Sequence, residues 1–127
     1  MINNFLIINC IGKNDKLGLR INKVFFIHTI DKKNEIKKNL VSEILDFLKR
    51  HNVKLNEHFS VIVNQGPGSF SGVRIALAIA KGLEISNKVK LFGFRNTDLK
   101  QFDQENIENL LNKNLIEKKL INPIYLS

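Results

Sequence analysis

Short apolar runs and one amphipathic stretch organise the first half of the chain. Residues 5–8 form a continuous apolar run that predicts a buried strand. Residues 17–21 and 24–30 are β-rich runs separated by Asn22-Lys23, which predicts a tight hairpin. From about residue 33 to 51, apolar residues recur at helical spacing with charged residues between them. The pattern predicts a three-stranded meander followed by an amphipathic helix that covers the sheet.

The second half alternates strand and helix patterns. Residues 59–63 and 89–93 are short apolar runs that predict two further strands, with a helical run at about 73–85 between them. Apolar residues at helical spacing mark a last amphipathic helix: Ile107, Leu110, Leu111 and Leu115. The chain closes on an extended segment around Pro123. The order βββαβαβ and then α predicts an α/β fold with a mixed sheet flanked by helices.

Length and composition fit one small domain. The chain has 127 residues, of which 43% are hydrophobic and 25% charged. No apolar run approaches the roughly 20 residues of a membrane span, and the run at residues 5–8 is too short for a signal peptide and has no basic flank, so we expect a cytoplasmic protein without membrane contact. Cys10 is the single cysteine and no histidine pair has metal-ligand spacing, so neither a disulfide nor a metal site is predicted.

The basic charge is concentrated in the first three quarters of the chain. Residues 1–95 carry 16 basic and 7 acidic side chains, whereas residues 96–127 carry 4 and 5, within a net charge of +8. Such a balance favours contact with nucleic acid or with an acidic protein surface. The basic residues are scattered as pairs, however, which also fits an ordinary solvated surface.

A glycine-rich segment lies between a predicted strand and the second helix. It consists of Gly66, Pro67, Gly68, Ser69, Phe70, Ser71 and Gly72. Backbone N–H groups in this position can hold an anion. The spacing nevertheless matches neither of the common nucleotide-binding motifs nor a nucleophile elbow. The favoured interpretation is a tight turn with Ser69 or Ser71 as the helix cap.

The helix that follows is rich in small residues and poor in charge. Gly72, Ala76 and Ala80 repeat every four residues along one side, and Ala78 and Gly82 lie on another. This pattern predicts close packing against a helix of a partner, although a central helix wrapped by its own chain remains the alternative. The candidate interface residues on the two helices are Gly72, Arg74, Ala76, Ile79, Ala80, Leu83, Leu40 and Ile44.

The glycine-rich segment and its helix closely resemble a long family signature. Residues 66–76, with Ala80-Lys81-Gly82-Leu83, resemble the G-P-G-S-F-T-G-x-R-I-G and A-x-G-L signature of the TsaB family, in the glycoprotease-like group. Residues 92–94 and 123–126 resemble later family segments in the same order. TsaB proteins are non-catalytic partners of TsaD in forming threonylcarbamoyladenosine (t6A) beside the tRNA anticodon.

The resemblance implies a fold and a set of partners. The fold would be half of a ribonuclease-H-like or actin-like ATPase (ASKHA) architecture. The chain would be a scaffold, not an enzyme, and would hold no cofactor, with catalysis in TsaD. Its helices would pack against TsaD or against a second copy, a TsaE-type ATPase could join, and tRNA would be reached mainly through the complex.

The chain departs from the family pattern in three places. Asn9 ends the first strand where related ATPases carry an aspartate, and Ser127 stands where the closing motif has arginine. The family usually carries a second domain after the strand at residues 92–94, and we expect residues 96–122 to be a shortened helical replacement for it. We therefore expect a TsaB-like domain at residues 1–95 and a shortened helical tail at 96–127. The alternatives are a basic ribonuclease-H-like module that binds tRNA directly and a degenerate TsaB paralogue.

Overall fold

A five-stranded mixed sheet forms the centre of the computed structural model, which describes residues 3–30 and 39–118. The strands are β1 (Phe5–Asn9), β2 (Lys16–Ile21), β3 (Val24–Thr29), β4 (Ser60–Asn64) and β5 (Lys90–Phe94). Their spatial order is β3-β2-β1-β4-β5. The pairs β1–β2 and β2–β3 are antiparallel, whereas β1–β4 and β4–β5 are parallel. The predicted α/β fold with a meander and two crossovers is confirmed.

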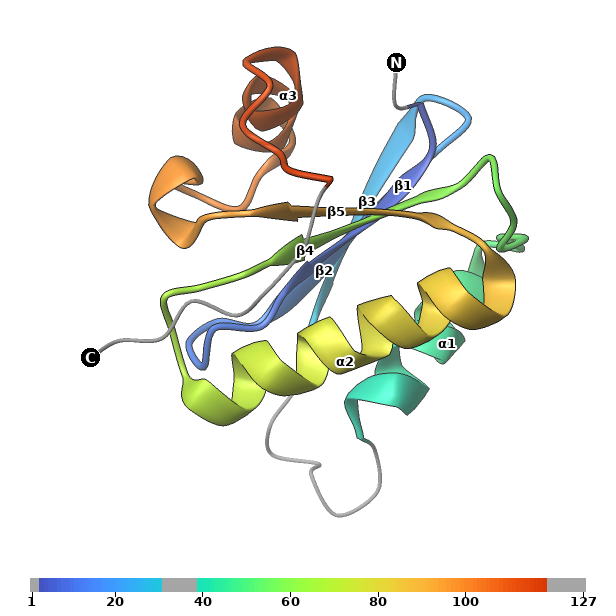
Figure 1. Cartoon of the computed structure of the whole chain (residues 1–127). Coiled ribbons are helices and arrows are strands. Elements are labelled where there is room, and N and C mark those ends of the chain that lie inside the picture. Colours follow the sequence, from blue (N-terminus) through green and yellow to red (C-terminus); the bar gives the residue numbers. More distant parts are fainter. Residues whose placement is uncertain (1–2, 31–38, 119–127) are drawn as a thin grey trace.

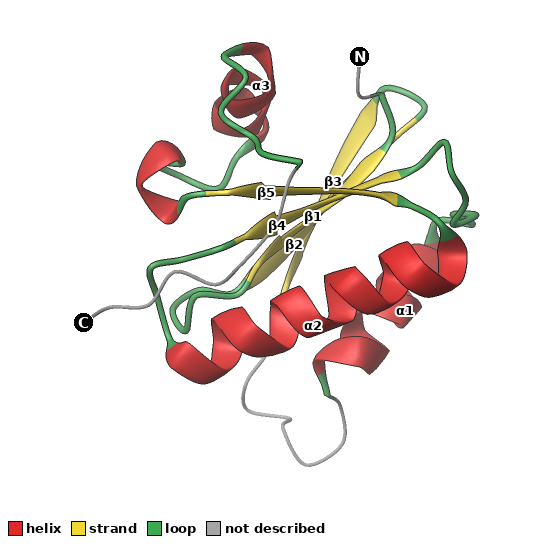
Figure 2. Ribbon diagram, viewed as in Figure 1, coloured by secondary structure: helices red, strands yellow, loops and turns green. Residues whose placement is uncertain are grey.

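Three helices cover the two faces of the sheet (Figures 1 and 2). The helices α1 (Leu40–Arg50) and α2 (Phe70–Asn87) lie on one face, and α3 (Gln104–Asn112) lies on the other. A short 3-10 turn, η2 (Asn96–Asp98), connects β5 to α3. Within the described ranges, no helix is both long and apolar enough to cross a lipid bilayer.

The two sheet faces have separate apolar cores. Under α1 and α2 the core includes Leu6, Ile8 and Val63, and under α3 it includes Phe5, Ile7 and others. All five residues of β1 are buried, as are all five of β4. Central strands with both faces covered become continuous apolar runs, which is why residues 5–8 were recognisable as a strand.

The hairpin and the helix ends show where local sequence decides the structure. Asn22 and Lys23 have φ angles of 51° and 71°, the left-handed pair that a two-residue hairpin turn requires. The first helix begins after Asn39, whose side chain accepts a hydrogen bond from the Ser42 N–H over 2.9 Å. The earlier part of the predicted helix, residues 33–38, lies outside the described residues, as does the closing segment at residues 123–126.

The last helix ends earlier than its apolar pattern predicted. Asn114 has a φ angle of 55°, so the chain turns away before Leu115 can continue the helix. Glu117 then pairs with Gly93 in an antiparallel bridge at the free edge of β5. Residues of α3 share a core with β1, β4 and β5. The segment after residue 95 thus packs directly on the sheet. A domain boundary at residue 95 stays a prediction.

We predict that Gly18→Val destabilises the fold. A Cβ at Gly18 would lie 2.7 Å from the Ile7 side chain and 3.1 Å from the rings of Phe25 and Phe102. Overpacking of this kind costs about 1–3 kcal/mol of unfolding free energy, measured by urea denaturation.

The matched control is Gly82→Ala, because a Cβ at Gly82 meets nothing within 4 Å. Alanine in a helix interior should raise the unfolding free energy by about 0.5–1 kcal/mol. An unchanged urea midpoint for Gly18→Val would contradict the tight packing of Gly18 against Ile7, Phe25 and Phe102.

Candidate functional site

The glycine-rich turn packs against the loop between β1 and β2. The Ser69 N–H donates to the Ile11 carbonyl over 2.8 Å, and a Cβ at Gly68 would lie 3.0 Å from that same oxygen. A Cβ at Gly72 would lie 3.1 Å from the Cys10 carbonyl oxygen. Glycine at these two positions therefore permits a backbone approach that a side chain would obstruct.

The N–H groups of Gly66, Ser69 and Gly72 are used inside the chain. The Gly66 N–H donates to Asn64 Oδ1 over 2.8 Å, and Ser69 Oγ accepts from the Gly72 N–H over 3.5 Å as the cap of α2. These partners favour a structural turn over an anion cradle. Of the two candidate caps, Ser69 is confirmed and Ser71 is wrong, because α2 begins at Phe70 and places Ser71 in its first turn.

Three asparagines meet where parallel strands end. Asn64 Nδ2 donates to Asn9 Oδ1 over 2.6 Å and to Asn96 Oδ1 over 3.1 Å. Asn9 and Asn64 are buried. The sequence pointed to Asn9 alone, and the cluster was missed because its members are 55 and 32 residues apart. The signal available was an asparagine at or just after the end of each of β1, β4 and β5.

The small-residue side of α2 faces the protein's own sheet. Ala76 and Ala80 are 0% exposed, and Ile44 of α1 is 1% exposed. Ile79, Leu83 and Leu40 are partly buried against the same core. The expectation that a partner contacts Ala76, Ala80 and Ile44 is therefore wrong, because β-sheet side chains already occupy that space. Of the predicted interface residues, Arg74 lies fully on the outside.

A different side of α2 is open to solvent. Ile75 is 51% exposed and Ile85 is 79% exposed, with the exposed small residues Ala78 and Gly82 between them. The intervals of three, four and three residues place these four on one side of the helix. We call them the apolar stripe. On the neighbouring helix α1, Val41 and Leu45 are 45% and 48% exposed. The outer surface of this helical layer is thus unusually apolar.

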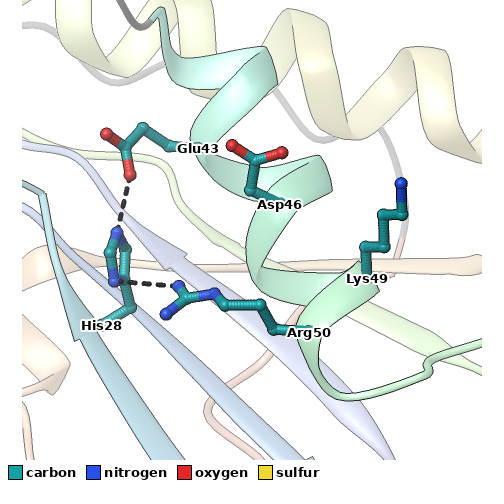
Figure 3. A pocket seen from close by; sticks show the side chains of 5 residues that line it. All are labelled: His28, Glu43, Asp46, Lys49 and Arg50. Atoms are coloured by element: carbon teal, nitrogen blue, oxygen red, sulfur yellow. Dashed lines mark hydrogen bonds and ion pairs between the residues drawn. The ribbon is translucent and has the colours of Figure 1, made fainter.

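A polar network ties the edge strand β3 to α1 (Figure 3). His28 Nε2 lies 2.6 Å from Glu43 Oε2, and Arg50 donates to His28 Nδ1 over 3.3 Å. Because arginine can only donate, Nδ1 is the acceptor and Nε2 carries the proton. The His28 ring also stacks on Phe47 at 5.5 Å. A hollow of about 420 Å³ adjoins this network, with Asp46 and Lys49 on its wall.

The geometry gives this network a structural role, because it joins β3 to α1. Both ring nitrogens of His28 are engaged, so neither is available to accept a proton from a substrate. His51 packs against the rings of Phe26 and Phe47, at 4.0 and 5.2 Å, whereas His58 is exposed. Among the described residues, no three side chains of the metal-binding types gather as a ligand set.

Comparisons with known proteins agree with the fold and the motif. A family model described as TsaD: tRNA N6-adenosine threonylcarbamoyltransferase matches residues 32–99. The tRNA threonylcarbamoyladenosine biosynthesis protein TsaB of Buchnera aphidicola subsp. Baizongia pistaciae is 50% identical over 46 residues, which are 36% of this chain and 21% of that protein. The resemblance to TsaB predicted from the glycine-rich motif is confirmed.

Solved structures share the fold. YeaZ from Pseudomonas aeruginosa superimposes with a TM-score of 0.65 at 20% identity, over 76% of this chain and 45% of that one. A second structure, of an uncharacterized protein with similarity to peptidase YEAZ from Pseudomonas aeruginosa, gives 0.65 at 19% identity over the same shares. The chain thus spans less than half of these structures, and the matched segment spans about a fifth of the curated relative.

We predict that Glu43→Ala loosens the contact between β3 and α1. The change removes the acceptor for His28 Nε2, and Glu43 is only 8% exposed. Loss of a hydrogen bond to a charged group should lower the unfolding free energy by about 1.5–3 kcal/mol, measured by urea denaturation.

The control is Glu84→Ala, which removes an exposed carboxylate from α2 and should change the unfolding free energy by less than about 0.5 kcal/mol. Equal effects of the two substitutions would contradict a stabilising network at His28.

Proposed function

The chain belongs to the family described as tRNA N6-adenosine threonylcarbamoyltransferase (TsaD), and we propose that it acts there as a TsaB-type partner subunit in t6A formation. In this role it pairs with a TsaD protein, which carries the transfer of the threonylcarbamoyl group to tRNA. Three observations support this proposal: the family match, the 46-residue match to a TsaB protein and the exposed surface of α2.

The apolar stripe carries the proposal. Large side chains at Ile75 and Ile85 flank a shallow centre formed by Ala78 and Gly82. A helix from another protein can approach closely over small residues, while the two isoleucines supply apolar area to bury. Large exposed aliphatic side chains clustered on one helix are typical of a protein-protein interface.

Helix α1 lies on the same face of the sheet as α2 and carries exposed aliphatic side chains of its own. Val41 and Leu45 occur one helical turn apart and are both about half exposed. Beside Leu45, a hollow of about 490 Å³ continues past the end of the helix to Val53 and Leu55. A partner that covers both helices would bury this apolar surface together with the stripe. Two helices packing on two helices is therefore the geometry that we propose.

The strand ends support assigning the chemistry to the partner. At the ends of β1 and β4, the amides of Asn9 and Asn64 hydrogen-bond to one another and to Asn96. Neutral amides supply neither a general base nor the negative charge that usually holds a phosphate-bound magnesium ion. Packing of α1 and α2 against TsaD needs no reactive side chain in this chain, so the chemistry can reside in the partner.

We predict that Ala78→Arg disrupts pairing without unfolding the chain. Ala78 is exposed in the free protein, so the arginine is solvated there, but in the complex it would be buried against apolar side chains. Affinity for the TsaD protein of the same organism should fall by roughly ten-fold or more, measured by calorimetry, with an unchanged circular dichroism spectrum.

Two controls isolate the surface. Asn109→Arg places the same side chain on exposed α3, on the other face of the sheet, and should leave affinity unchanged. Ala76→Arg enters the core, where Ala76 is 0% exposed, and should unfold the protein. Wild-type affinity of a folded Ala78→Arg variant would rule out the stripe as the docking surface.

A further inference from the structure

Another cavity lies on the opposite face of the sheet, beneath α3. It has a volume of about 750 Å³, within the roughly 300–1,000 Å³ range of small-molecule sites. Its walls come from β2, β5, the C-terminal half of α3 and residues 114–118. The apolar stripe and the glycine-rich turn contribute nothing to this cavity, so its chemistry is independent of the site described above.

The base of the cavity offers an aromatic surface. Phe92 of β5 lines it together with Leu111 and Ile116, and all three are partly buried against the core under α3. Leu91, the preceding residue, points into the other core. The alternation along β5 thus turns Phe92 to this face, where a planar ligand can stack.

The rim carries positive charge. Arg20 and Lys118 both line the cavity, against one acidic residue, Glu108. Arg20 Nη1 and Glu108 Oε1 are 3.6 Å apart, a long contact that occupies one end of the guanidinium. Since arginine has five N–H donors, it retains donors for an anion such as a phosphate.

Amide side chains complete the lining. Asn3, Asn112 and Asn114 all border the cavity. An amide offers a donor and an acceptor side by side, the arrangement that reads the edge of a purine base. An aromatic surface, cations and amides together match the three parts of a nucleotide: a base to stack, a base edge to hydrogen-bond and a phosphate.

We propose that this cavity binds one purine nucleotide of single-stranded RNA, with the base on Phe92 and the phosphate on Arg20 and Lys118. The choice of RNA over a free nucleotide rests on the proposed function in t6A formation and on the net charge of +8. The same chemistry would also accept adenosine monophosphate, and the experiment separates the two sources.

The test is fluorescence anisotropy of the full chain with labelled single-stranded oligoadenylate, titrated at several salt concentrations. Phe92→Leu retains apolar volume but removes the ring, so affinity should fall roughly five-fold while the salt dependence is kept. Lys118→Gln should lower affinity and reduce the slope of log affinity against log salt by about 0.7, the value for one phosphate contact.

The matched control is Lys113→Gln, which removes the same charge from an exposed position outside the cavity. It should leave both affinity and slope nearly unchanged. Lys118 is also exposed, so its substitution tests the proposal even if Phe92→Leu fails to fold.

Three results would overturn the proposal. One is the absence of oligoadenylate binding by the wild-type chain. Another is an equal loss of oligoadenylate affinity in Lys113→Gln and Lys118→Gln, which would indicate binding to a diffuse basic surface. The third is binding of adenosine monophosphate that Phe92→Leu weakens while oligoadenylate affinity is unaffected, which assigns the cavity to a free nucleotide. None of them bears on pairing with TsaD, which is measured without RNA.

Discussion

The close approach of α2 to the sheet is the constraint on which the rest of the structure depends. Gly72 lets the helix begin against the Cys10 carbonyl, and Ala76 and Ala80 continue the contact with no exposed surface. Larger side chains at these positions would push the helix away from the core. Once this side is fixed inward, the opposite side of the helix must face solvent, and that side carries the apolar stripe.

The two faces of the sheet consequently present different surfaces. The outer surface of the layer formed by α1 and α2 carries exposed aliphatic side chains, among them Ile75 and Ile85, which suit a protein partner. The α3 face holds a cavity with an aromatic base and a cationic rim, including Phe92 and Arg20, which suits a nucleotide. A central sheet buried on both sides holds these surfaces rigidly apart. The two proposed binding surfaces therefore do not overlap.

The order of strands and helices along the chain was predictable from the sequence, because buried central strands form continuous apolar runs and the covering helices show apolar residues at helical spacing. The orientation of α2 was not. Small residues occur on two of its sides, at Ala76 and Ala80 and again at Ala78 and Gly82, and periodicity alone treats both alike. Only contact with the sheet distinguishes the inner side from the outer one.

The candidate site shows the same limit. The glycine-rich turn was located from the sequence, since a run of Gly, Pro and Ser between a strand pattern and a helix pattern is a local signal. The bonds of Asn64 with Asn9 and Asn96, and the network from His28 to Glu43, join elements distant in sequence, so no local pattern reveals them. The end of α3 was missed for a simpler reason, since the left-handed backbone of Asn114 has no hydrophobic signature.

The most direct test of the central claim is reconstitution of t6A formation with the TsaD protein of the same organism, with and without this chain. The account predicts co-elution of the two proteins on size exclusion and modification of tRNA that depends on the chain. Equal modification in its absence, together with separate elution, would contradict a partner role for the surface formed by α1 and α2.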